Sequence, residues 1–222
     1  MKIELRLGIQ FEEPEELLIY YFNKAGKGAQ SYDKARFHDD TLFTECQIRQ
    51  LVDLISHFGG MIRSKKVKEE IIKGLIQKKR EIELILMDIS SKHTILDKEE
   101  EIPWQKIVSL FNECRIKQVG LTRMTKILHK KRPDLIPILD KIVVCQYLEP
   151  ILKERGKITH NQNERAIFYI KELKYDIEIN KDDLLILQQS LKSKGYGVYD
   201  MSLLRLLDIL IWSHFFYKEH KS

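Results

Sequence analysis

The first eleven residues alternate between apolar and polar side chains. The apolar positions are Ile3, Leu5, Leu7, Ile9 and Phe11. Because successive side chains of a strand point to opposite faces, this period of two predicts one half-buried β-strand over residues 2–11. A single strand needs a partner, and the best candidate is the segment YDIEI at 175–179.

Most of the remaining chain has the period of an α-helix. Thr44 and Gln47 have the spacing of a capping box, and an apolar stripe from Ile48 to Ile55 follows them. The helix is expected to end at Gly59-Gly60. Similar stripes predict helices near 67–75 and 104–111, and further helices are expected near 161–173 and 181–193. Residues 80–89 are interpreted as helical because they continue directly from the helix before them. Residues 23–40 are rich in glycine, lysine and aspartate and are interpreted as a loop, and the polar stretch 90–101 as a linker.

The final predicted helix, residues 201–217, is apolar on nearly every side. Such a helix belongs in the centre of a protein, so its two charged residues, Arg205 and Asp208, are expected to be partly buried. An unpaired buried charge is very costly, and the two could form an ion pair at i, i+3 spacing. The alternative is that Asp208 binds something at a cleft.

These elements predict a mainly α-helical protein that forms a single domain over residues 1–222. Its parts are an N-terminal strand and loop (1–36), a first helical lobe (37–90) and a second helical lobe (102–217). The three cysteines lack metal-site spacing, and neither a metal nor a cofactor is predicted. No apolar stretch approaches the length of a signal peptide or a membrane span, which favours a cytoplasmic protein without membrane contact. The oligomeric state is left open.

Positive charge is concentrated in two tracts, although the net charge is only +5. Eight basic and two acidic residues lie between Arg63 and Arg80, where a solvated helix face is an equally good explanation. The basic segment 115–133 holds seven basic residues and no acidic one. Such a tract suits DNA or another polyanion as a partner.

Residues 119–140, VGLTRMTKILHKKRPDLIPILD, contain the most informative pattern. Gly120 opens a short helix, a basic loop follows, and Asp140 stands at the start of the next helix. Asp140 could therefore be a helix N-cap, a catalytic or ligand-binding carboxylate, or both.

This order of helix, glycine turn, helix, loop and acidic residue resembles the helix-hairpin-helix DNA glycosylase superfamily. The resemblance implies a two-lobed helical fold in which the hairpin amides bind a DNA phosphate and the carboxylate assists cleavage of a glycosidic bond. Many members have a nucleophilic lysine two residues after the second hairpin glycine, with the carboxylate 18 residues further on. Here that lysine position is Thr122, and 140 − 122 gives the same spacing.

The chain also departs from this superfamily. The usual glycine–apolar–glycine hairpin is Gln118, Val119 and Gly120, so the first glycine is absent. Thr122 cannot act as an amine nucleophile. Any catalysis implied by the resemblance would therefore be monofunctional, with Asp140 activating water or stabilising a cationic sugar.

A second resemblance covers more of the chain. The strings RFHDD (near 37–41), KILHKKRPDLIPILDKIV (126–143) and SLLRLLDILIW (202–212) are similar to an uncharacterised bacterial domain family with KRPxLIPxxD and LRxLDxxxW blocks. That family implies no activity. Its blocks group Lys126, His129, Lys131, Arg132 and Asp140 into one site, to which Asp208 and Trp212 could also belong.

Three functions are therefore open: nucleic-acid binding, a monofunctional DNA glycosylase that uses Asp140, and a non-enzymatic protein-interaction scaffold. The candidate catalytic residue is Asp140. The candidate nucleic-acid-binding residues are Gly120, Thr122, Arg123, Lys126, Lys130, Lys131 and Arg132. The residues predicted to line a cleft are His129, Asp208 and Trp212.

Overall fold

The computed structural model describes residues 2–24, 26–37, 41–58, 62–156, 161–196 and 201–221. It is mainly helical, as the sequence predicts, with one small antiparallel sheet. The elements are β1 (Ile3–Leu5), β2 (Ile9–Phe11), α1 (Pro14–Lys24), α2 (Lys27–Lys34), α3 (Glu45–His57), α4 (Lys65–Gln77), α5 (Lys79–Asp88), α6 (Trp104–Glu113), α7 (Leu121–His129), the π-helical segment η1 (Val143–Leu148), α8 (Glu149–Glu154), α9 (Gln162–Ile179), α10 (Lys181–Ser193) and α11 (Leu203–Lys221).

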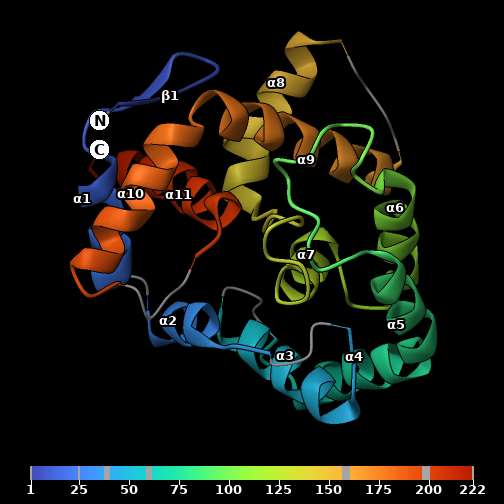
Figure 1. Ribbon diagram of the computed structural model, residues 1–222. Helices are drawn as coiled ribbons and strands as arrows, with labels where there is room; N and C mark the ends of the chain where they lie inside the picture. Colours follow the sequence, from blue (N-terminus) through green and yellow to red (C-terminus); the bar gives the residue numbers. More distant parts are fainter. Residues whose placement is uncertain are drawn as a thin grey trace.

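The chain makes a circuit around the short helix α7 (Figure 1). Helices α2 to α5 lie along one side, and α1 lies with α9, α10 and α11 on the other. Helix α11 packs against α1, α10, α9 and η1, which explains why it is apolar on nearly every side. Helix α3 packs against both α4 and α7, so α7 lies between the two groups of helices.

The capping box at the start of α3 is confirmed. The Thr44 side chain accepts a hydrogen bond from the Gln47 backbone N–H at 3.2 Å, and the Gln47 side chain accepts one from the Thr44 N–H at 3.3 Å. This signal is local, and the two reciprocal bonds satisfy N–H groups that lack partners within the helix. The described residues of α3 stop before the predicted end at Gly59-Gly60, which lies outside the described ranges.

The prediction of one long N-terminal strand is wrong. Residues 3–11 form a hairpin of two short strands that turns through Leu7 and Gly8, whose φ angles are 62° and 66°. The alternation continues through the turn, so periodicity alone could not reveal it. Leu7, which the pattern places on the buried face, is exposed at the turn.

The predicted partner strand at 175–179 is also wrong, because these residues belong to α9. The segment nevertheless lies against the hairpin. Arg6 forms an ion pair with Asp176 at 2.7 Å, and Asn180 accepts a hydrogen bond from the Glu4 N–H at 3.0 Å. The hairpin therefore docks on the end of a helix through polar side chains instead of pairing with a third strand.

The interpretation of residues 23–40 as a loop needs correction too. Residues 14–24 and 27–34 form α1 and α2, although residues 38–40 lie outside the described ranges. Tyr32 of α2 is buried, and its hydroxyl donates a hydrogen bond to the Lys126 carbonyl at 2.6 Å. This tertiary contact stabilises a helix whose composition favours a loop.

The polar stretch 90–101 connects α5 to α6 and is held by its neighbours. Ile95 is buried, and its N–H donates to the Asp134 carbonyl at 2.8 Å. Lys174 of α9 donates to the Ile95 carbonyl, also at 2.8 Å. The division of the chain into lobes on either side of this stretch stays a prediction.

Gly28 of α2 lies directly against the end of α3. A Cβ at this position would lie 1.9 Å from the backbone carbonyl oxygen of His57. We expect Gly28→Ala to lower the free energy of unfolding by about 1–3 kcal/mol, despite the better helix propensity of alanine. The new methyl group would overlap the His57 backbone, and moving that backbone would disturb the packing of α3. Urea unfolding monitored by circular dichroism measures this loss.

The control is Gly26→Ser at the N-cap of the same helix. A Cβ at Gly26 meets no atom within 4 Å, and serine is a good N-cap residue, so this variant should keep its stability. Equal stability of both variants and the unmodified chain would show that α2 and α3 are further apart than described.

Candidate functional site

A cavity of about 320 Å³ lies between α1, α2 and α11 and the end of α3, and we call it the Asp140 cavity. Aromatic side chains provide much of its lining, and a few charged side chains converge on it. The lining residues are Tyr20, Tyr21, Lys24, Gly26, Gly28, Ala29, His57, Phe58, Lys126, Ile138, Asp140, Arg205, Asp208, Ile209, Trp212 and Phe216. An apolar pocket with a few convergent polar groups is the usual form of a small-molecule site.

Asp140 is both an N-cap and a group that faces the cavity. Its Oδ1 accepts a hydrogen bond from the Ile142 N–H at 3.0 Å, and its carbonyl accepts one from the Val144 N–H at 2.9 Å. Its Oδ2 lies 3.6 Å from the Lys126 ammonium, and its side chain is 24% exposed. The helical turn that it starts continues into the π-helical segment η1, and π-helical turns are frequent at functional sites.

Lys126 connects Asp140 to the end of α3. Its Nζ donates to the Phe58 carbonyl at 2.9 Å and lies 4.1 Å from the centre of the Phe58 ring. Burial lowers the pKa of Lys126, although the Asp140 carboxylate acts in the opposite direction. One helical turn earlier, the Thr122 hydroxyl donates to the Leu139 carbonyl at 2.9 Å, so two turns of α7 are fixed against the segment that carries Asp140.

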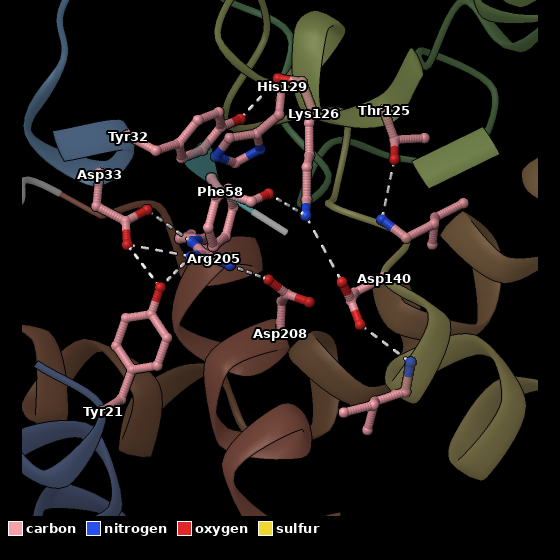
Figure 2. Close-up of polar contacts among 12 residues, drawn as sticks. Tyr21, Tyr32, Asp33, Phe58, Thr125, Lys126, His129, Asp140, Arg205 and Asp208 are labelled. Carbon is pink, nitrogen blue, oxygen red and sulfur yellow. Dashed lines mark hydrogen bonds and ion pairs between the residues drawn. The ribbon is translucent and has the colours of Figure 1, made fainter. Parts of the chain in front are cut away.

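A buried ionic cluster surrounds Arg205 (Figure 2). Its Nε and Nη2 donate to the two carboxylate oxygens of Asp33 at 2.9 and 3.1 Å, and Nη2 also donates to the Tyr21 hydroxyl at 2.6 Å. The predicted ion pair of Arg205 with Asp208 is confirmed. Asp33 and Tyr21 were not predicted as its partners. Asp33 lies in the region 23–40 that was interpreted as a loop, and Tyr21 lies in α1, where no element was predicted.

Asp208 is a second carboxylate on the same guanidinium. Burial raises its pKa to about 7; Arg205 opposes the shift and the negative charge of Asp140 adds to it. Its Oδ2 accepts from Arg205, and its other oxygen is on the side of Asp140 in Figure 2. Strongly shifted carboxyl groups in a cavity are candidates for a functional role.

The basic segment 115–133 is explained in part by helix capping. Lys130 donates to the Ala35 carbonyl at the end of α2 at 3.3 Å, and Lys126 donates to Phe58 at the end of α3. Arg132 donates to the Leu86 carbonyl and, at 2.7 Å, to the Ile89 carbonyl at the end of α5. Cations at helix C-termini satisfy carbonyls that lack partners in the helix and face the negative end of its dipole. Three cations of the segment therefore stabilise the fold.

Two further predicted site residues are buried next to these. Lys131 donates to the Gln47 side chain at 3.1 Å. His129 Nδ1 donates to the Ile136 carbonyl at 2.7 Å, and burial, with the nearby charge of Lys130, lowers the pKa of His129 to about 3. Burial also lowers the pKa of Lys130 to about 8. His129, Lys130 and Lys131 line a separate cavity of about 230 Å³ instead of the Asp140 cavity.

The turn before α7 has a backbone conformation that glycine usually adopts, although the residue there is glutamine. Gln118, two residues before the N-cap Gly120, has a φ of 69°, in the left-handed region that glycine adopts easily. Its carbonyl accepts a hydrogen bond from Arg123 at 2.5 Å. Gly120 is the N-cap of α7 and has open space beside it.

The structure thus brings together four of the predicted residues and separates the others. Lys126, Asp140, Asp208 and Trp212 line the Asp140 cavity. Gly120, Thr122 and Arg123 lie at or after the turn, while His129, Lys131 and Arg132 are buried in the packing around α7. The phosphate contacts predicted for the last two stay a prediction, and their hydrogen bonds to neighbouring segments give them a structural role.

The residues that the sequence missed come from the first 60 positions. Tyr20, Tyr21, Lys24 and Phe58 line the cavity, and Asp33 fixes Arg205. Their sequence signal was a run of three aromatic residues, Tyr20 to Phe22, before a glycine-rich stretch, which does not indicate a site. In the described ranges, no group of three or more metal-ligating side chains has the geometry to hold a metal ion. No helix in the same ranges is long and apolar enough to cross a membrane.

Comparison with models of protein families gives a match over most of the chain. The model of a family of unknown function (DUF6308) matches residues 53–215, which include α7, Asp140 and most of α11 but neither α1 nor α2. No curated protein matches the chain, and no solved structure does. One side of the Asp140 cavity therefore lies outside the matched region.

Proposed function

The chain belongs to the family of unknown function DUF6308, and we propose that it binds nucleic acid and hydrolyses an N-glycosidic bond with Asp140. The observation that carries the proposal is the position of the Asp140 carboxylate, which is partly exposed in an aromatic-lined cavity of about 320 Å³. A cavity of this size and lining suits a planar ring such as an extruded base. In this proposal the two groups of helices around α7 are the lobes of a glycosylase-like fold.

The chemistry requires an anion beside the sugar. As the bond between C1′ and the base nitrogen breaks, its electron pair leaves with the base and positive charge develops on the sugar. The Asp140 carboxylate would stabilise this charge and accept a proton from the water whose oxygen forms the new bond to C1′. This proton then passes through solvent to the nitrogen of the released base, which leaves Asp140 ionised again. The Lys126 ammonium lies 3.6 Å from this carboxylate, on the side away from its N-cap hydrogen bond.

The turn at Gly120 supports binding of the phosphate backbone. The first N–H groups of a helix have no partners within the helix, and they suit a phosphate oxygen. The positive φ of Gln118 supports a turn of the glycosylase type despite the missing glycine. The bond from Thr122 to the Leu139 carbonyl fixes this helix start next to Asp140, so phosphate and sugar could be held by adjoining parts of the chain.

Asp140→Asn tests the proposal. Asparagine still accepts the N-cap hydrogen bond, so the helix start should be retained while the negative charge is lost. We expect base release to fall by at least about 100-fold, the lower end for general acid–base catalysis, with DNA affinity unchanged. The assay measures free base by mass spectrometry from single- and double-stranded oligonucleotides that carry deaminated, alkylated or oxidised bases.

The control is Asp182→Asn, which removes an exposed carboxylate from α10 and should retain full activity. Retention on DNA that weakens with salt, without base release by the unmodified protein, would reduce the proposal to nucleic-acid binding alone. Absence of both retention and release would reject it and favour a protein-interaction scaffold.

A further inference from the structure

Asp208 has one carboxylate oxygen that no described residue uses. The side chain is 2% exposed, Oδ2 is bound by Arg205, and Oδ1 is buried without a hydrogen-bond partner among the described residues. Leaving a buried acceptor without a donor costs free energy, so such groups are rare and need an explanation. Because Asp208 lines the Asp140 cavity, a bound molecule could supply the missing donor.

The fold does not need this carboxylate to neutralise Arg205. Asp33 already accepts two hydrogen bonds from the guanidinium, and Tyr21 accepts a third. Asp208 therefore adds a second negative charge to a cation that already has a close partner, and burial raises the pKa of Asp208 to about 7.

The aromatic residues on the same helix indicate how a bound planar ring would be oriented in the cavity. Asp208, Trp212 and Phe216 follow one another at intervals of four on α11, and all three line the cavity. The Trp212 and Phe216 rings are stacked, with centroids 4.4 Å apart. Side chains at i and i+4 lie on the same face of a helix, so a planar ring placed against Trp212 would direct one edge toward Asp208.

We propose that Asp208 Oδ1 selects heteroaromatic rings that carry an N–H donor on the edge facing α11. The inference rests on the proposed function in taking the cavity as the site of a base, and it names the class of base. Rings with an amino or lactam N–H fit the site, and rings methylated at that nitrogen do not. Asp208 would act here as a specificity residue that contacts the base.

The test uses free bases, which need neither DNA nor bond cleavage. Calorimetry or ligand-observed NMR compares hypoxanthine with 1-methylhypoxanthine, and adenine with N6,N6-dimethyladenine. For the unmodified protein we expect methylation to weaken binding in at least one pair by about 10- to 100-fold, the range for a hydrogen bond to a charged group. Asp208→Asn should weaken binding of the unmethylated base and reduce the discrimination to within about threefold, because the charge-assisted bond is lost.

Asp182→Asn is again the control and should discriminate like the unmodified protein. Equal binding of both members of each pair by the unmodified protein would overturn the inference, and so would no binding of any of the four bases at millimolar concentration. Discrimination that persists in Asp208→Asn, with folding verified by circular dichroism, would also overturn it. Discrimination by a protein that releases no base would reject the proposed hydrolysis and leave the inference standing.

Discussion

Arg205→Met should lower the free energy of unfolding by about 3–5 kcal/mol, the usual cost of leaving one member of a buried ion pair without its partner. The guanidinium binds Asp33 and Asp208, which are both nearly inaccessible to solvent. Methionine fills a similar volume but leaves two carboxylates and the Tyr21 hydroxyl without this donor. Urea denaturation at pH 7 measures the loss.

Two further variants separate charge from packing. Asp208→Asn in the Arg205→Met background removes one of the unpaired charges and should recover part of the stability, which a double-mutant cycle would show. Arg49→Met breaks an exposed pair with Glu45 and should leave stability nearly unchanged. If Arg205→Met behaves like Arg49→Met, the buried cluster does not contribute as described.

His129→Asn should change the dependence of stability on pH. The folded state keeps His129 neutral down to a pKa of about 3, whereas the unfolded chain takes up this proton near pH 6.5. Protonation therefore favours the unfolded state as the pH falls below 6.5, by about 1.4 kcal/mol per unit and about 5 kcal/mol over the whole window. Relative to the unmodified protein, the variant should gain about 2 kcal/mol between pH 6.5 and 4.5.

The readout is the difference in unfolding free energy between variant and unmodified protein at each pH. For Asp208 the effect of pH on stability has the opposite sign, because its folded-state pKa of about 7 lies above the ordinary 3.8. Protonation then favours the folded state as the pH falls from 7 to 4, so Asp208→Asn should lose stability relative to the unmodified protein over this range. His57→Asn is the matched control, because the ring of His57 is exposed. A difference for His129→Asn that does not vary with pH would contradict the burial of its neutral ring.

The parts of the fold that the sequence predicted correctly depend on neighbouring residues. The capping box at Thr44 and the apolar stripes of α3, α4, α6 and α10 are satisfied within a few turns of chain, so a local pattern describes them. Helix α2 depends instead on contacts with residues about 90 positions away, such as the bond of Tyr32 to Lys126. A composition of glycine, lysine and aspartate could not reveal those contacts.

The candidate site was predictable to a similar extent. The sequence predicts Asp140 as a candidate catalytic residue and, as the alternative to an ion pair with Arg205, Asp208 as a cleft residue, and both line one cavity. The aromatic residues from α1 and the end of α3 could not be assigned, because no spacing in the sequence connects them with Asp140. The basic segment 115–133 suggests a surface for anions, whereas several of its cations donate hydrogen bonds to backbone carbonyls. A count of charges cannot distinguish a cation that binds a partner from one that caps a helix of the same chain.

The capping of three helices by α7 and the residues after it has a consequence for synthesis of the chain. The carbonyls at the ends of α2, α3 and α5 bond to donors that follow 95, 68 and 43 residues later. A ribosome that has completed α5 has therefore not yet made the donors on which all three helix ends depend. The first 90 residues cannot reach their final arrangement until Arg132 has left the exit tunnel.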